Sequence, residues 1–470
     1  MTALPQKPFR PRIAILSGYM TYYEPHMPEG FRAARAAWGQ DIAALLAGIG
    51  EARFFGLMTD LETGRRIGAD LSAWAPDVLV LAPAMPGPPA FTWEAIAGLP
   101  RVPVVLWAAG HLDGLAPDYD SIDHLANSGA VGVAMIGNML ARHGRAPTVL
   151  AGRWTDAAAR RDLCAAVRRA AVAGRLARAR VGVLGRPLDG YSNVVVDAGL
   201  LRDRLGAELV EVPLAEWEET FAAVDPAAVD GVRDWLVAHC RVEAPDGEDL
   251  LASCRLAAAL AAVAARHGLD CGTFNSHLEY SHANPAIGLV GGLATSWLTS
   301  TGIPFTDTGD TVTAIAMLAA RLLTGTSVYT ELNLIDYAAD AVLCANTGEA
   351  DFAAAGTVRV APARSSTGKV QRGAIVDAEF VPGPATIVGF TPVPEGLRFI
   401  AMPGELLGRP ELDLHVPHTL FRPASGSAAA GFARWIEAGA THHAAIARGD
   451  AAADIAGIAR LLNLDVRIVP

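Results

Sequence analysis

The run RIAILSG at residues 12–18 is the first of several short, β-rich stretches that end in glycine or proline. Helical patterns, such as those at 32–48 and 128–143, separate it from the runs that follow. These runs are EARFFGL (51–57), DVLVLAP (77–83), VPVVLWA (102–108) and APTVLAG (146–152). Buried strands that alternate with helices are typical of a parallel sheet covered on both faces. The sequence therefore predicts an N-terminal α/β domain at residues 1–176.

The same pattern begins again at RARVGVLG, residues 178–185, and continues to the strand-like LDCGTFN at 269–275. We therefore expect a central, Rossmann-like parallel-sheet domain at residues 177–328. After this point apolar and polar residues alternate, and turn residues recur every 8 to 12 positions. This texture predicts a mainly antiparallel β domain at residues 329–470. The expected fold class is thus α/β, with two parallel-sheet domains followed by a β-rich C-terminal domain.

Composition narrows the possible partners of this chain of 470 residues. The formal net charge is -11, which argues against nucleic acid as a partner because binding phosphates requires a basic face. The five cysteines include no CxxC pair, so we expect reduced thiols and a cytoplasmic location. We also expect no membrane association.

One segment could be mistaken for a membrane span, because residues 283–306 carry no charge. Its glycines and its break at TGIPF favour a buried helix of a soluble protein instead. In that interpretation Asn284 caps the helix and Pro285 takes the first helical position.

The common catalytic motifs are absent, and clusters of potential ligands stand in their place. GVLGRP at 182–187 is neither a dinucleotide-binding nor a Walker loop, and the sequence contains no GxSxG. Three clusters lie in the second half: His277, Glu279 and His282; Asp307, Thr308 and Asp310; and Glu331, Asp336 and Glu349. WIEAGATHHAAIA adds His442 beside His443.

Each cluster also has a structural explanation. The first two histidines could be ordinary loop groups, and Thr308 or Asp310 could cap the helix that begins near Thr311. Residues that follow one another in a strand face opposite sides, so at most one of His442 and His443 can face a given site.

Taken together, these segments resemble the L-arabinose isomerase family and, more distantly, L-fucose isomerase. WIEAGATHHAAIA is similar to the family's Trp, Ala-Gly-Gly-Ala-His-His signature. LVGGLATSWLTSTGIPFTDTGDTVTAIAMLAARLLTG resembles its helix, Gly-Glu-Gly-Asp, helix segment, and YTELNLIDYAADAVLCANTGEAD its segment with the second catalytic glutamate. The resemblance implies an arabinose isomerase-like fold and a homo-oligomer, a trimer or hexamer with a cleft between subunits.

The family interconverts an aldose and a ketose. In the family, two carboxylates and two imidazoles hold a Mn²⁺-type ion, and two glutamates move a proton between C1 and C2 through an enediol. The resemblance assigns the second glutamate to Glu331 and the C-terminal ligand to His442 or His443. Thr308 stands in place of the first glutamate and Asn346 in place of the central histidine. A histidine from the neighbouring subunit is also replaced, around Ser128.

These replacements change the chemistry of the expected site. A threonine hydroxyl is too weak an acid to act as a base, and a neutral asparagine is a poor substitute for imidazole at a divalent ion. Either another side chain completes a manganese or similar divalent-metal site around Glu331 and the terminal histidines, or the protein works without the family's metal. The side chains that could complete it are Asp307, Asp310, Glu349, His277 and His282.

The sequence therefore predicts a divergent, isomerase-like enzyme that moves protons on a small, carbohydrate-like substrate. The catalytic candidates are Glu331, Asp310 and Thr308; the substrate-binding candidates are Asn346, His277 and His282; and the metal candidates are Glu331, His442 and His443. Two alternatives remain open, a lyase or hydrolase that uses the same cleft and a non-catalytic small-molecule binder. All three require Thr308, Glu331, Asn346 and one of the paired histidines to converge on one hollow.

Overall fold

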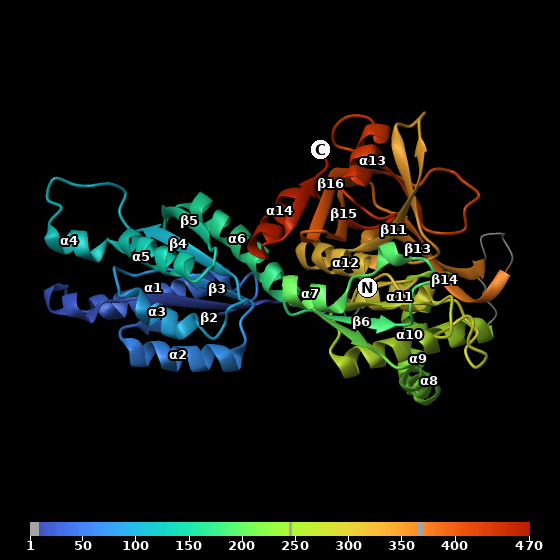
Figure 1. The fold of residues 1–470 in the computed structure, drawn as a ribbon, viewed down its shortest axis with the longest axis horizontal. Coiled ribbons are helices and arrows are strands. Elements are labelled where there is room, and N and C mark those ends of the chain that lie inside the picture. Colours follow the sequence, from blue (N-terminus) through green and yellow to red (C-terminus); the bar gives the residue numbers. More distant parts are fainter. Residues whose placement is uncertain (1–8, 244–246, 365–369) are drawn as a thin grey trace. The chain divides into compact units, whose positions relative to one another are not determined.

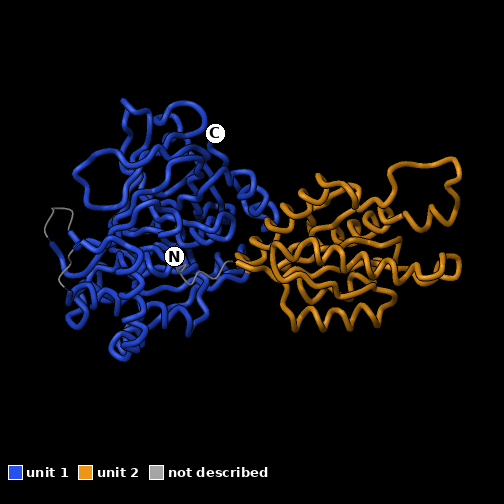
Figure 2. The backbone as a smooth tube through the Cα atoms, turned by 180° about the vertical axis from the view of Figure 1, so that it is seen from behind, with its two compact units in different colours: residues 1–8, 178–470 blue, residues 9–177 orange. Residues whose placement is uncertain are grey.

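The computed structural model describes residues 9–243, 247–364 and 370–470. Residues 9–177 form one compact unit and residues 178–470 form another (Figure 2). Each unit has its own sheets and its own buried core (Figure 1).

The N-terminal unit is built on a five-stranded parallel sheet with the strand order β2-β1-β3-β4-β5. Its strands are β1 (Arg12–Gly18), β2 (Glu51–Met58), β3 (Val78–Leu81), β4 (Val104–Gly110) and β5 (Thr148–Arg153). Its helices are α1 (Phe31–Leu46), α2 (Leu61–Trp74), α3 (Pro89–Ile96), α4 (Ser121–Ala126), α5 (Gly129–Arg142) and α6 (Ala157–Leu176). All four residues of β3 are buried, as expected for a central strand with helices on both faces. Right-handed crossovers place α1 and α6 on one face and α2, α3 and α5 on the other.

A second parallel sheet opens the larger unit, with the order β10-β9-β6-β7. Its strands are β6 (Arg180–Leu184), β7 (Glu208–Glu211), β9 (Cys271–Phe274) and β10 (Phe305–Thr306). The accompanying helices are α7 (Ala198–Arg204), α8 (Leu214–Ala223), α9 (Pro226–His239), α10 (Gly247–His267), α11 (Gly292–Thr301) and α12 (Thr311–Thr324). The helix α11 precedes the short strand β10, and α12 follows it. The candidate site lies near the connection between β10 and α12.

The prediction that a helix begins at Asn284 and Pro285 is wrong. The Asn284 side chain accepts a hydrogen bond from the backbone N–H of Ala286, at 2.9 Å, and so closes a turn. The helix α11 starts only at Gly292, after the run of glycines, and it is buried as predicted. Within the described residues, no helix has both the length and the apolar character needed to cross a membrane.

The C-terminal part is a closed antiparallel barrel. Its strand order is β15-β18-β11-β12-β17-β16, and an additional pairing of β15 with β16 closes the ring. The ring strands are β11 (Val328–Asp336), β12 (Ala341–Ala345), β15 (Gly383–Val393), β16 (Gly396–Gly408), β17 (His418–Pro423) and β18 (His443–Arg448). The strand β19 (Asp465–Ile468) adds to β16 in parallel, and the helices are α13 (Ala428–Glu437) and α14 (Ala452–Leu461). The predicted fold class, parallel α/β domains followed by a mainly antiparallel β domain, is confirmed.

Several contacts join the central sheet region to the barrel region within the larger unit, and two of them involve strand pairing or a buried charge. The strand β8 (Arg241–Val242) pairs with β13 (Ala355–Arg364), which forms a hairpin with β14 (Val370–Phe380). Arg321 of α12 also forms a buried ion pair with Asp351, at 2.7 Å. A buried pair of this kind leaves an uncompensated charge if it is separated, so it resists relative movement of the two parts.

Candidate active site

The helix α12 begins with a buried carboxylate that has two tasks. Asp310 is fully buried, and its Oδ1 accepts a hydrogen bond from the backbone N–H of Thr313, at 2.8 Å. This is the N-cap interaction expected from the sequence, and it fixes the orientation of the carboxylate. Its second oxygen, Oδ2, lies 2.7 Å from Nδ1 of His443. The Asp310 carboxylate therefore both caps α12 and holds the imidazole of His443.

Strand pairing in the barrel brings the other two groups together. In the antiparallel pair of β11 and β18, Glu331 lies directly opposite His443. Nε2 of His443 is 3.3 Å from Oε1 of Glu331. Tyr329 lies two residues before Glu331 and hence on the same face of β11, and its hydroxyl is 2.9 Å from Nδ1 of His443. Asp310, His443 and Glu331 thus form a continuous chain of contacts, which we call the acid/base triad.

Electrostatics favours charged groups throughout the triad. Burial alone would lower the pKa of His443, but its hydrogen bonds to Asp310 and Glu331 outweigh burial and raise the pKa to about 9. The hydrogen bond with His443 in turn lowers the pKa of Glu331. Burial raises the pKa of Tyr329 well above its ordinary value, so its hydroxyl stays neutral. At neutral pH the triad therefore contains an imidazolium between two carboxylates.

Thr308 occupies a strained position next to the triad. Its φ angle is 65°, in the left-handed region that a β-branched residue rarely adopts. Its hydroxyl oxygen is buried and meets no hydrogen-bond partner of good geometry among the described residues. Strain and an unsatisfied hydroxyl both cost stability, and such costs concentrate at functional sites.

Replacing Thr308 by glycine should therefore stabilise the protein by up to about 1 kcal/mol, because glycine adopts this φ freely and removes the unsatisfied hydroxyl, although it adds freedom to the unfolded chain. Urea denaturation measures the change. Thr324→Gly in α12, where the backbone is helical and the hydroxyl is bonded, should instead destabilise. A loss of stability in both variants would contradict the account of Thr308.

The structure assigns Asn346 a different task from the one expected. Its amide nitrogen donates to the backbone carbonyls of Tyr329 and Glu349, at 2.6 and 2.7 Å. Its amide oxygen accepts from the backbone N–H groups of Gly348 and Glu349, both at 2.9 Å. With four backbone bonds the amide is fully occupied and shapes the turn at 346–349. Asn346 nevertheless lines a cavity of about 550 Å³ together with Glu331.

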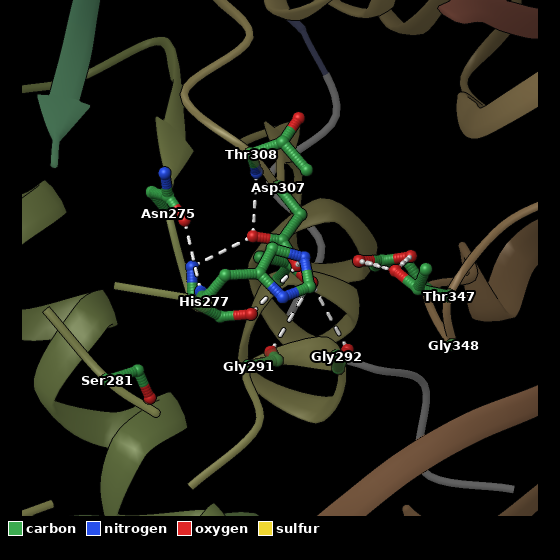
Figure 3. Close-up of polar contacts among 12 residues, drawn as sticks. Asn275, His277, Ser281, Gly291, Gly292, Asp307, Thr308, Thr347 and Gly348 are labelled. Atoms are coloured by element: carbon green, nitrogen blue, oxygen red, sulfur yellow. Dashed lines mark hydrogen bonds and ion pairs between the residues drawn. The ribbon is translucent and has the colours of Figure 1, made fainter. Parts of the chain in front are cut away.

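A second, smaller cavity of about 260 Å³ carries several ionisable side chains among aliphatic ones. His277, His282, Asp307 and Glu349 line it, and Thr347 lines both cavities. Figure 3 shows the Asp307 carboxylate directed toward the His277 ring, whereas the Thr308 hydroxyl points away from it; Nε2 of His277 is 3.7 Å from Oδ2 of Asp307. The side chains of the adjacent residues Asp307 and Thr308 thus point in different directions. Asp307 lines the smaller cavity, whereas Thr308 lies near the triad.

Glu349 is a buried carboxyl group whose side-chain hydrogen bonds, among the residues that the structure describes, come from the neutral hydroxyl of Thr347. Burial, reinforced by the charge of Asp307, raises the pKa of Glu349 to about 8, while the hydroxyl of Thr347, 3.3 Å from Oε1, opposes the shift. A raised pKa in the folded state means that the favourable contribution of the protonated form is complete below the ordinary value near 4.5 and is lost as the pH rises through about 8.

Glu349→Gln, which keeps the shape but cannot ionise, should therefore increase stability by about 1–2 kcal/mol at pH 8 and by little at pH 5. Denaturation at the two pH values measures this difference. Glu395→Gln, at an exposed turn, is the matched control and should show no such pH dependence. An equal effect of Glu349→Gln at both pH values would argue against a raised pKa.

The remaining candidates are not part of the triad, although the His442 ring lies against that of His443, with 3.8 Å between the centroids. His442 is exposed, and its Nδ1 lies 3.2 Å from the Asn193 amide and 3.1 Å from the Thr441 hydroxyl. Of the paired histidines it is therefore His443 that contacts Glu331. His277 and His282 line the smaller cavity, away from the triad. Sequence reasoning overlooked Tyr329, although its spacing of two residues from Glu331 was the available signal.

The donor set does not fit the four-ligand metal site that the resemblance implies. Within the described residues, no group of three or more histidine, cysteine, aspartate and glutamate side chains is arranged to hold an ion. Glu331 and His443 are adjacent, but Asn346 is occupied by backbone bonds and Thr308 supplies only a neutral hydroxyl. Two ligands are too few for firm binding of a Mn²⁺-type ion.

Parallel α/β domains followed by a mainly antiparallel β domain are the fold that the resemblance to sugar isomerases implies. Residues 330–465 match the family model described as the L-arabinose isomerase C-terminal domain. The match covers the C-terminal domain, and for this domain the resemblance seen in the sequence is confirmed. No curated protein matches the chain.

Proposed function

We propose that the protein is an isomerase-like enzyme that moves a proton between neighbouring carbons of a small polyhydroxylated carbonyl compound, with the acid/base triad in place of the family's metal. The observation that carries this proposal is the contact of Glu331 with His443, whose other ring nitrogen is held by Asp310. Glu331 lines the larger cavity, and the buried His443 imidazole lies directly behind it, 3.3 Å from its carboxylate. A carboxylate base and a protonated imidazole are the two groups that an enediol reaction requires.

The proton balance can be written with these two groups alone. Glu331 removes the proton from the carbon next to the carbonyl group, and the N–H of His443 protonates the carbonyl oxygen, which gives an enediol. The protonated Glu331 then delivers its proton to the former carbonyl carbon, and the hydroxyl on the neighbouring carbon returns its proton to His443. An aldose has become a ketose, and both side chains have recovered their starting states.

The surroundings support these roles. Asp310 holds the imidazole in one orientation and stabilises its charge, as a carboxylate does for a catalytic histidine. The two cavities that share Thr347 offer room for a substrate on both sides of the turn at 346–349. The match of residues 330–465 to the arabinose isomerase C-terminal domain favours isomerase chemistry over a lyase, a hydrolase or a binder.

The test is hydrogen exchange in D₂O, because enediol formation exchanges a carbon-bound proton even where little product accumulates. The purified protein is incubated with a panel of aldopentoses, aldohexoses and the corresponding ketoses, and proton NMR follows the loss of the signal at the carbon next to the carbonyl. Exchange of at least one sugar above the buffer rate supports the proposal. A panel that remains fully protonated, with protein whose folding is verified, contradicts it.

A further inference from the structure

The larger cavity has a wall unlike the rest of the site. Its lining includes Leu334 of β11 and the segment of Leu412, Asp413 and Leu414, which lies in the connection between β16 and β17. These three leucine side chains are 51%, 47% and 37% exposed. Single exposed leucines are common on proteins, but several that line one cavity beside an ionised carboxylate indicate a binding surface.

The two cavities therefore differ in chemistry although they share Thr347. The smaller one is lined by carboxyl, imidazole, guanidinium and amide groups beside a few aliphatic side chains. The larger one combines four leucines and a valine with Glu331, Asp413 and the amides of Asn333 and Asn346. The larger volume, about 550 Å³, also falls in the range of about 300–1,000 Å³ that is usual for pockets of drug-sized ligands. A simple sugar held by the polar groups would leave the leucine wall in contact with water.

We propose that the substrate is amphiphilic: its hydroxylated end lies at Glu331 and the polar cavity, and an apolar group of several carbons packs against Leu334, Leu412 and Leu414. The inference rests on the proposed function in one respect, the placement of the reacting carbons at Glu331. The occupant is assigned to the substrate because the leucine wall and the catalytic carboxylate line the same cavity. A second copy of this chain is the other possible cover, and the experiment distinguishes the two.

The experiment measures binding of 1,2-diols of increasing length, because the diol mimics two neighbouring sugar hydroxyls without requiring a particular stereochemistry. Glu331→Gln protein is titrated with 1,2-butanediol, 1,2-hexanediol and 1,2-octanediol, and dissociation constants are obtained by NMR or calorimetry. Each fully buried methylene is worth up to about fourfold in affinity. We expect 1,2-octanediol to bind at least about tenfold more tightly than 1,2-butanediol.

Two further variants show where the apolar group binds. Leu412→Ser combined with Leu414→Ser should remove most of the length dependence, because these side chains supply the apolar contact. Leu251→Ser, on the exposed face of α10 and 41% exposed, is the matched control and should preserve it. A length dependence that is absent, or that survives the double variant, would overturn the proposal.

The oligomeric state of the leucine variant and the hydrogen-exchange experiment distinguish the remaining possibilities. If the protein is an oligomer that dissociates in the Leu412→Ser, Leu414→Ser variant, and the diols show no length dependence, a second copy covers the wall and the proposal is wrong. Because binding is measured in Glu331→Gln protein, it does not depend on turnover. Failure of the sugar panel to exchange would thus contradict the proposed reaction, whereas failure of the diol series would contradict only the amphiphilic substrate.

Discussion

Replacing Glu331 by glutamine is expected to lower the rate of carbon-bound hydrogen exchange by about 10²–10⁴-fold. Glutamine preserves the shape of the side chain and its place opposite His443, but its amide cannot accept a proton from carbon. The dependence of diol binding on chain length should change little, because the replacement leaves the apolar wall intact. The measurement is the exchange rate in D₂O with the sugar that the wild-type protein exchanges fastest.

Glu405→Gln provides the matched control for this prediction. Glu405 is an exposed residue of β16 in the same barrel and does not line either of the two cavities described. Its replacement should leave the exchange rate unchanged. Should Glu331→Gln protein exchange as fast as the wild type, Glu331 is not the base and the proposed proton path is wrong.

The second large effect concerns stability and arises at Asp310. Replacing Asp310 by alanine removes the cap of α12, worth about 1 kcal/mol, and also the principal partner of the buried His443. Removing one member of a buried ion pair typically costs about 3–5 kcal/mol, and here Glu331 remains as a second partner of the imidazole. We therefore expect a total loss of about 3–4 kcal/mol in the free energy of unfolding.

Urea denaturation of Asp310→Ala and Asp225→Ala protein separates the two contributions. Asp225 caps α9 through the backbone N–H of Ala227 and has no described contact with a histidine, so its replacement should cost only about 1 kcal/mol. Adding His443→Phe to Asp310→Ala should restore part of the lost stability, because it removes the uncompensated group. Equal losses in the two single variants would mean that the Asp310–His443 contact contributes nothing.

Local sequence patterns were sufficient for most of the fold. Apolar runs such as 12–18 and 178–185 lie in parallel strands because a strand covered on both faces needs no polar residues. The sequence also predicted the helix cap at Asp310, because an acidic residue directly before an apolar helical run can accept hydrogen bonds from the free amides of the first helical turn. The predicted helix cap at Asn284 was wrong because an asparagine side chain closes a turn as readily as it caps a helix.

The arrangement of the site required tertiary information. Glu331 and His443 meet through the register of two strands that are distant in the sequence, and no local pattern fixes such a register. The positive φ of Thr308 could not be predicted from the sequence either, because β-branched residues rarely adopt positive φ angles. Asn346 lines the larger cavity, but the use of its amide by the backbone depends on the fold of the turn and could not be predicted from the sequence.

The central claim is that Glu331 and His443 act as one proton-transfer unit, and the exchange rate of the double variant Glu331→Gln, His443→Gln tests it most directly. Groups that act as a unit lose their effect together, so the double variant should exchange about as slowly as the slower single variant. Losses that multiply, so that the double variant is slower by the product of the two single effects, would mean that the two side chains act independently and would contradict the account.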